Sequence, residues 1–149
     1  MSRNLPTLLA LLGFAVLPAG AQSPTRISAD APIVNFRLPT YTVPDGYRAW
    51  LVRGSEARVA GPNDITIKEL TMTIFSGDAK EHIETMILSP SAKVAPADQI
   101  ATGDDTIRVI NDNFEATGVG WRYEYKDKKV SIARHVRVVL HSELKGLLK

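Results

Sequence analysis

The chain has 149 residues, of which 44% are apolar, 23% charged and 7% aromatic, with 18 basic against 16 acidic side chains. This composition is that of an ordinary globular protein of one domain, and it excludes collagen, a long coiled coil and a polar disordered tail. The absence of cysteine excludes a disulfide scaffold, a thiolate metal site and a cysteine nucleophile.

The first residues have the pattern of a secretory signal peptide. A basic start with Arg3 precedes the mainly apolar stretch Leu5–Leu17, and Ala19 and Ala21 have the spacing of a cleavage site. An uncut membrane anchor is the alternative, but the apolar stretch is shorter than the roughly 20 residues that span a bilayer. We therefore predict cleavage near Ala21 and a mature protein in the periplasm. The predicted segments are a signal peptide over 1–21, a flexible segment over 22–31, a folded domain over 32–141 and a short tail over 142–149.

The rest of the chain has the period-2 alternation of β-strands almost throughout. The predicted strands are Ile33–Leu38, Tyr47–Arg53, Ala57–Ala60, Leu70–Phe75, Lys80–Leu88, Gln99–Thr102, Thr106–Ile110, Phe114–Thr117, Val119–Lys126 and Val136–His141. Turn residues separate them at 44–46, 61–64, 76–78, 89–91, 103–105, 111–113 and 127–128. These turns are too frequent for crossover helices, so we predict an all-β, antiparallel fold. The one helical candidate is the tail over 142–149, which Gly146 weakens.

A weak internal repeat is visible in the apolar positions. Ile65 and Ile67 followed by Leu70, Met72 and Ile74 resemble Val130 and Ile132 followed by Val136, Val138 and Leu140. The inward phase slips between the two halves of each copy, at 68–69 and at 133–135. A slip of this kind requires a bulge or a break, since the apolar set would otherwise change face. The stretch 54–59 before the first copy also parallels the stretch 120–125 before the second copy.

No catalytic constellation is found in the sequence. The three histidines lack the spacing of a metal-binding helix, and no serine lies in a nucleophile elbow. The run Trp121–Lys126 alternates aromatic and charged residues, as a base-stacking platform does. An amphipathic strand with its aromatic side chains inward explains it better, because the basic residues are scattered. We therefore expect no enzyme activity, no metal, no cofactor and no nucleic acid partner.

Several degenerate motifs follow one another in a fixed order. They are Pro32–Pro39; Trp50, Gly54 and Ala57; Ile65, Ile67 and Leu70; Ser89, Pro90 and Ala92; Ala101 and Gly103; Ile107 and Val109; Phe114, Gly118, Gly120, Trp121 and Tyr123; and Val130, Ile132, Val136 and Val138. In this order the sequence resembles the periplasmic lipopolysaccharide-export family, the LptC/LptA/OstA-like group. The resemblance runs from Pro32 to Leu140.

The resemblance implies a curved, twisted antiparallel half jelly roll, folded like a taco around an apolar groove. Members of this family pass the acyl chains of lipopolysaccharide along the groove, and they join edge to edge with other jelly rolls or with the inner-membrane transporter. They are not enzymes. LptC-type members keep a membrane helix, whereas the leader here resembles that of the soluble LptA-type bridge. Whether the chain is the bridge or the transporter-bound component stays open.

Two sets of residues are expected to carry this role. The groove-lining residues are predicted to be Ile65, Ile67, Leu70, Met72, Ile74, Trp121, Tyr123, Val130, Ile132, Val136 and Val138. The last strand, Val136–His141, is predicted to pair with a partner, with Arg137, Val139 and His141 on its outward face. The alternative is a structural or adaptor β-sandwich of the envelope, with a filled core and a protein partner only, because a closed core uses the same apolar residues.

Overall fold

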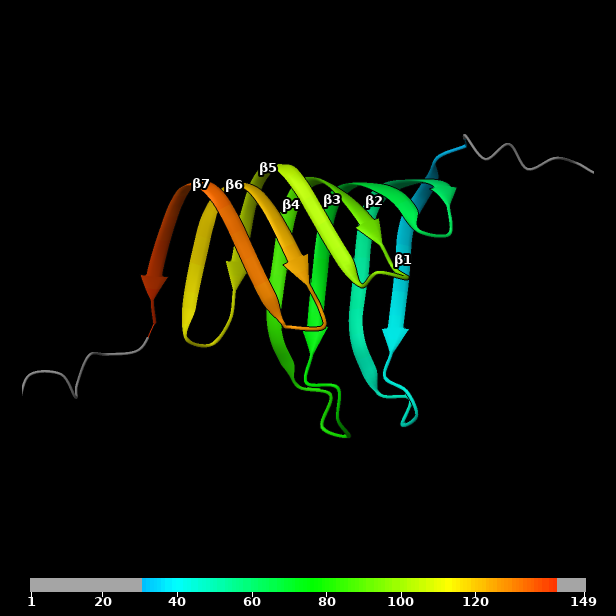
Figure 1. The fold of residues 1–149 in the computed structure, drawn as a ribbon, viewed down its shortest axis with the longest axis horizontal. Helices are drawn as coiled ribbons and strands as arrows, with labels where there is room; N and C mark the ends of the chain where they lie inside the picture. The colour runs from blue at the N-terminus through cyan, green and yellow to red at the C-terminus, as the bar shows by residue number, and fades with distance from the viewer. Residues whose placement is uncertain (1–30, 142–149) are drawn as a thin grey trace, which may run out of the picture.

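The protein folds as one antiparallel sheet in the computed structural model, which describes residues 31–141. The strands are β1 (Ile33–Tyr41), β2 (Arg48–Gly61), β3 (Asp64–Phe75), β4 (Ile83–Ala95), β5 (Ile100–Ile110), β6 (Phe114–Glu124) and β7 (Lys129–Leu140). Each strand pairs with the next one in sequence, so that β1 and β7 are the edges (Figure 1). The predicted all-β fold is thus confirmed. The predicted leader, nearly all of the 22–31 segment and the predicted tail lie outside the described residues.

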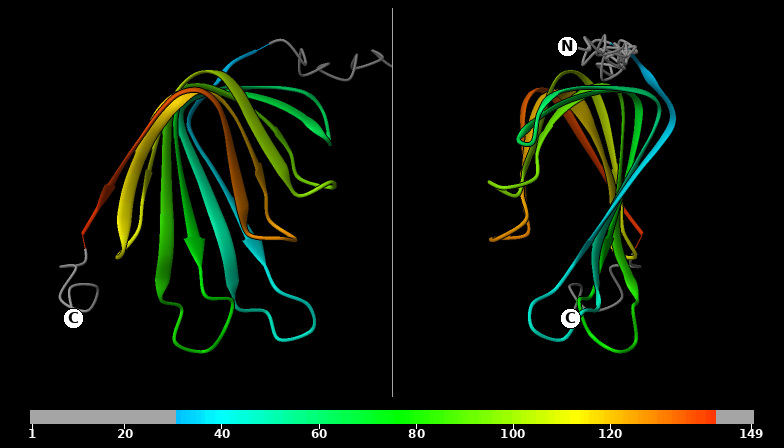
Figure 2. Two further views of the ribbon diagram at one scale, coloured as in Figure 1. Left: turned by 60° about the vertical axis from the view of Figure 1, so that its left-hand side comes forward. Right: turned by 90° about the vertical axis from the view of Figure 1, so that its right-hand side faces the viewer.

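The sheet bends sharply across the middle of its strands into two arms (Figure 2). We call the bend the crease. Arm A comprises residues 36–41, 48–53, 70–75, 83–88, 107–110, 114–117 and 136–140. Arm B comprises residues 33–34, 56–61, 64–68, 91–95, 100–103, 119–124 and 129–134. The inner faces of the two arms are turned toward each other, which gives the half jelly roll.

The crease is built from β-bulges, one of the devices that lets a sheet bend sharply. Glu69 in β3 and His135 in β7 have positive φ angles of 50° and 53°, at the two places where the apolar phase slips in the sequence. Asn35 in β1 and Gly120 in β6 also have positive φ. The pairing register shifts between Gly103 and Thr106, and again between Thr117 and Val119. The predicted mid-strand bulges are therefore present.

Two of the predicted turns are wrong for the same reason. The residues 89–91 and 103–105 lie inside β4 and β5, where these strands cross the crease. Proline, serine and aspartate favour both turns and irregular strand positions, so local composition does not separate a kink from a chain reversal. The remaining predicted turns do connect strands. Strand β1 also continues through Pro39 to Tyr41, because one side of an edge strand makes no ladder hydrogen bonds.

Glycines allow the strands to approach closely at the crease. A Cβ atom on Gly54 would lie 2.3 Å from Ile67 Cγ2 and 2.9 Å from the Lys68 carbonyl oxygen. A Cβ atom on Gly118 would lie 2.3 Å from Ile132 Cγ2, again with a carbonyl oxygen at 2.9 Å. The internal repeat is therefore structural, but Gly118 is the counterpart of Gly54, and the second copy begins two residues earlier than predicted.

The candidate groove between the arms

The interior between the arms is densely packed around β2, β3 and β4. The largest fully buried side chains are Trp50, Tyr123, Ile67, Leu70, Met72, Ile87, Val52 and Val94. Most of them come from these three strands, so side chains of the two arms pack against each other here and leave the interior filled. We call this region the packed end of the interior.

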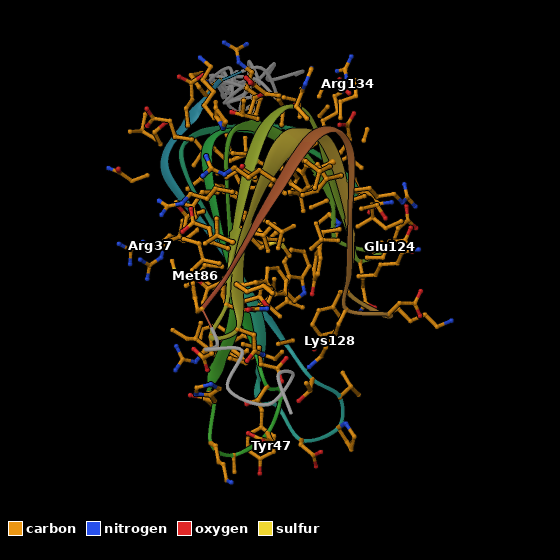
Figure 3. The ribbon with its side chains drawn as sticks, turned by 90° about the vertical axis from the view of Figure 1, so that its left-hand side faces the viewer. Arg37, Tyr47, Met86, Glu124, Lys128 and Arg134 are labelled. Atoms are coloured by element: carbon orange, nitrogen blue, oxygen red, sulfur yellow. The ribbon has the colours of Figure 1, made fainter. Side chains whose placement is uncertain are left out.

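Two contacts of the β6–β7 hairpin connect arm B to arm A across the interior. The ring of Trp50 in arm A stacks on Tyr125, at the tip of the β6–β7 hairpin, with 6.5 Å between ring centroids. Lys128 on the same hairpin reaches Glu84 of arm A, with 2.6 Å between Nζ and Oε2. Figure 3 shows Lys128 directed into the space between the arms, while Glu124 lies on the outside of arm B.

A buried polar contact supports the crease itself. The Ser89 hydroxyl lies 2.7 Å from the Thr106 carbonyl oxygen and accepts a hydrogen bond of 3.1 Å from Trp121 Nε1. Ser89 is the one buried polar residue among the described core positions. This contact joins β4, β5 and β6 at the bend, and it satisfies the indole N–H of a buried tryptophan.

Toward β7 the interior opens into a groove of about 430 Å³. Its walls are mainly apolar and come from both arms. The lining residues are Thr85, Val109, Asn111, Phe114 and Ala116 from arm A and the turn beside it, Lys128, Val130 and Ile132 from arm B and its hairpin, and Val136 and Val138 from the end of β7. We call this region the open end of the interior. The groove therefore reaches the edge strand of the sheet.

The predicted groove-lining residues divide between these two regions. Seven of them are buried in the core and fill it: Ile65, Ile67, Leu70, Met72, Ile74, Trp121 and Tyr123. The other four line the open groove: Val130, Ile132, Val136 and Val138. Trp121 and Tyr123 are buried, so they form no exposed platform for stacking bases. This agrees with the prediction of an amphipathic strand with its aromatic side chains inward.

Sequence reasoning missed six of the ten groove residues: Thr85, Val109, Asn111, Phe114, Ala116 and Lys128. Val109 and Ala116 lie on predicted strands, and their alternation with charged neighbours was a usable signal. Thr85 and Lys128 had no such signal, because they meet only when the hairpin of arm B folds over arm A.

Two polar atoms in the interior have no hydrogen-bond partner among the described residues, Trp50 Nε1 and Tyr123 Oη. Burial raises the pKa of the Tyr123 phenol above its usual range, with smaller contributions from Tyr125 and Glu84. The interior is thus a low-dielectric environment that disfavours a charge.

The two edge strands carry most of the large apolar side chains that are exposed. On β7 these are Val136, Val138, Val139 and Leu140, which are 46–59% exposed, and on β1 they are Ile33, Val34 and Tyr41. The predicted outward residues Arg137 and Val139 lie on β7, and His141 directly follows it. The amide of His141 donates to the Asn113 carbonyl oxygen at 2.8 Å, which ties the end of β7 to the β5–β6 turn.

Comparison with known protein families assigns the chain to one of them. The family described as lipopolysaccharide-assembly, LptC-related, matches residues 21–141, which is most of the chain. The chain belongs to the LptC-related family. No match was found among the curated proteins. This family implies a role in lipopolysaccharide transport at the periplasmic side of the envelope and interaction with other proteins of that transport system. Within residues 31–141 of this LptC-related chain, no helix is long and apolar enough to cross a membrane.

Proposed function

We propose that this LptC-related chain binds the acyl chains of lipopolysaccharide in the open groove and passes them to a neighbouring jelly roll paired with β7. The observation that carries the proposal is the groove itself, whose apolar walls come from both arms and reach the sheet edge. The function is one of binding and transfer, without chemistry on the lipid. We also propose that the leader is removed near Ala21, which intact-mass analysis of the isolated protein would test.

The exposed valines of β7 support an apolar ligand. Val136 and Val138 line the groove, yet 54% and 53% of their surfaces are exposed. Covering such surface is favourable, and an acyl chain gains about 0.8 kcal/mol for each methylene removed from water.

The backbone of β7 supports transfer to a partner. In an antiparallel pair, successive amides point alternately toward and away from the neighbouring strand. The bond from His141 to Asn113 fixes this phase, so the amides of Arg137 and Val139 point to β6 and those of Val138 and Leu140 point away. The outward amides offer a ladder to a further strand, which would extend the groove wall into the next protein.

A pair of variants on one strand tests the groove. Val138 and Val139 are adjacent, 53% and 46% exposed, but Val138 lines the groove and Val139 does not. We expect Val138→Asp to lose co-purifying lipid, measured by native mass spectrometry, because a carboxylate is costly in an apolar site. Val139→Asp should keep it. Equal lipid content in both variants, or no lipid in the parent, would refute the groove and favour the adaptor alternative.

A second pair of variants tests the edge. Val138→Pro removes an outward amide, whereas Val139→Pro removes an amide bonded to β6. We expect Val138→Pro to abolish crosslinks to a partner from photoreactive groups at positions 137, 139 and 141 while the protein stays as stable as the parent. Val139→Pro should lower stability instead. Crosslinks that run only within the chain would contradict pairing with a partner.

A further inference from the structure

The outer face of arm A carries a row of arginines that the groove does not use. Directly paired positions of all seven strands form this row: Arg37, Arg53, Thr71, Leu88, Arg108, Thr117 and Arg137. Four of the seven are arginine and none is acidic. Figure 3 shows Arg37 on the outer side of arm A, away from the interior.

The first two arginines of the row face each other, and neither forms an ion pair among the described residues. Arg37 and Arg53 are directly opposite on β1 and β2, an arrangement that is unfavourable for like charges. Among residues 31–141, no carboxylate lies within 4.0 Å of either guanidinium. Both line a hollow of about 210 Å³, together with Asn35, Ser55 and Glu69. The hollow thus brings two guanidinium groups and two neutral polar side chains to one place, with Glu69 as its one acidic member.

The next row of the same face is apolar. It consists of Pro39, Leu51, Thr73, Met86, Ile110, Glu115 and Val139. The outer face of a one-layer sheet is ordinarily polar, so five apolar residues in a row of seven are unusual. Its single acid, Glu115, is bonded to Arg108, with 2.6 Å between Oε1 and Nε.

The outer face of arm B provides the contrast. It also carries basic residues, and some of them have acidic partners in the adjoining rows. Arg58 and Lys68 both lie within 4.0 Å of Glu56, and Arg122 is bonded to Glu124. Lys93, which lies between Arg58 and Arg122 in one row, forms no ion pair among the described residues. The contrast is therefore one of arrangement: on arm A, two arginines without ion pairs are directly opposite each other and adjoin the apolar row.

We propose that the outer face of arm A binds the surface of an anionic lipid bilayer. Guanidinium groups match the geometry of phosphate oxygens, so Arg37 and Arg53 would hold lipid headgroup phosphates in and around their hollow. The parallel apolar row would contact the boundary between headgroups and acyl chains, as the apolar face of an interfacial helix does. With strands about 4.8 Å apart, the two rows span roughly 30 Å, which suits an extended surface rather than a single small anion.

Vesicle co-sedimentation of the chain as isolated from cells tests this proposal. We expect stronger binding to vesicles with 30% phosphatidylglycerol than to pure phosphatidylcholine vesicles. Arg37→Gln combined with Arg53→Gln should weaken the binding about tenfold or more at low salt, since each basic residue near an anionic leaflet contributes about a factor of five. The matched control is Arg58→Gln with Arg122→Gln, which removes the same charge from arm B and should retain most of the binding. Met86→Gln should weaken binding a few-fold with an unchanged salt dependence.

Several outcomes would overturn the proposal. Equal losses in the two double variants would mean that net charge alone governs binding. Equal binding to both kinds of vesicle would mean that no anionic surface is recognised, as expected if the partner is an acidic protein. Displacement by millimolar inorganic phosphate at constant ionic strength would assign the hollow to free phosphate. Thermal unfolding of each variant checks that the fold is kept, and Val138→Asp, which alters the groove, should leave vesicle binding unchanged.

Discussion

The packed end and the open end of the interior are built from the same kinds of side chain, yet one is a core and the other a groove. Trp50 at the packed end is 1% exposed, whereas Val138 at the open end is 53% exposed. At the packed end, the inner residues of β2–β4 have strands on both sides and the hairpin of arm B over them. Among the described residues the sheet ends at β7, so the inner residues of β7 have a neighbouring strand on one side only.

The difference shows that position in the strand order, rather than composition, decides whether an apolar face is filled. The alternation of Val130, Ile132, Val136 and Val138 is the same pattern as that of the buried positions in β3. The pattern becomes a groove wall because no eighth strand follows within the described residues. An edge of this kind is a place where a ligand or a further strand can complete the packing.

Truncating one side chain at each end should give the largest contrast. We expect Trp50→Ala to lower the free energy of unfolding by about 3–5 kcal/mol, because it leaves a cavity and removes the stack on Tyr125. Val138→Ala should cost less than about 1 kcal/mol, since its side chain is half exposed. Urea unfolding of both variants measures the difference. A cost for Val138→Ala close to that for Trp50→Ala would mean that the β7 end is packed as well.

Alanine at the crease glycines should sharpen the comparison with a smaller effect. A Cβ atom meets an isoleucine Cγ2 at 2.3 Å in both Gly54→Ala and Gly118→Ala. Ile67 is fully buried and cannot yield, so we expect a loss of about 2–3 kcal/mol for Gly54→Ala. Ile132 lines the open groove and can shift, but the contact with the Arg134 carbonyl oxygen remains, so a smaller loss of about 1–2 kcal/mol is expected for Gly118→Ala.

Gly61 supplies the control for these two variants. It lies on the same strand as Gly54, but a Cβ atom there would meet nothing within 4 Å. Gly61→Ala should therefore change the unfolding free energy by no more than about 0.5 kcal/mol. Equal losses of stability for Gly54→Ala and Gly118→Ala would show that the surroundings of the two isoleucines are equally rigid. This result would contradict the distinction between a packed end and an open end.

The sequence predicts the inner face of the sheet well and the bend poorly. Period-2 alternation placed the buried residues of β3 and β6 on one face, and the phase slip at 68–69 located a bulge. Local composition predicts turns at 89–91 and 103–105, where the strands only kink, because serine, proline, glycine and aspartate suit both. Only the pairing of β4 with β5 and of β5 with β6 distinguishes them.

The sequence could not predict which of the expected groove residues fill the core and which line the open groove, for a different reason. Whether Ile67 or Ile132 faces a filled core depends on which strands lie above each of them, and this is a long-range property. The same holds for Thr85 and Lys128, which are far apart in the chain and line the same groove. Local periodicity contains no information on such contacts.

The pH dependence of stability should report on the packed end alone. Burial raises the pKa of the Tyr123 phenol above its usual value near 10, so the folded protein keeps this proton after the unfolded chain has lost it. Stability from this group is therefore complete below pH 10 and falls above it, by at most about 1.4 kcal/mol per pH unit. Urea midpoints at pH 9 and pH 11 measure the fall.

Substitution at Tyr123 isolates that contribution. Tyr123→Phe should remove most of the fall and should not lower stability at pH 8, because the hydroxyl has no partner among the described residues. Tyr41→Phe, which removes an exposed phenol, should keep the parent's behaviour. If the Tyr123→Phe protein loses stability above pH 10 as the parent does, the phenol is not held in a low-dielectric core.

The ion pair between Lys128 and Glu84 should have the smallest effect, although it joins the two arms beside the groove. Both side chains are more than a third exposed, and exposed pairs contribute little because water and salt screen them. A double-mutant cycle with Lys128→Met and Glu84→Gln should give a coupling below about 0.5 kcal/mol that vanishes in 1 M salt. The arms would then be held by apolar contacts such as that of Trp50 with Tyr125 on the same hairpin, and loss of the ion pair alone would leave the arms together. A coupling above about 1.5 kcal/mol would instead make this pair a latch, and the open end would depend on charge rather than on the end of the sheet.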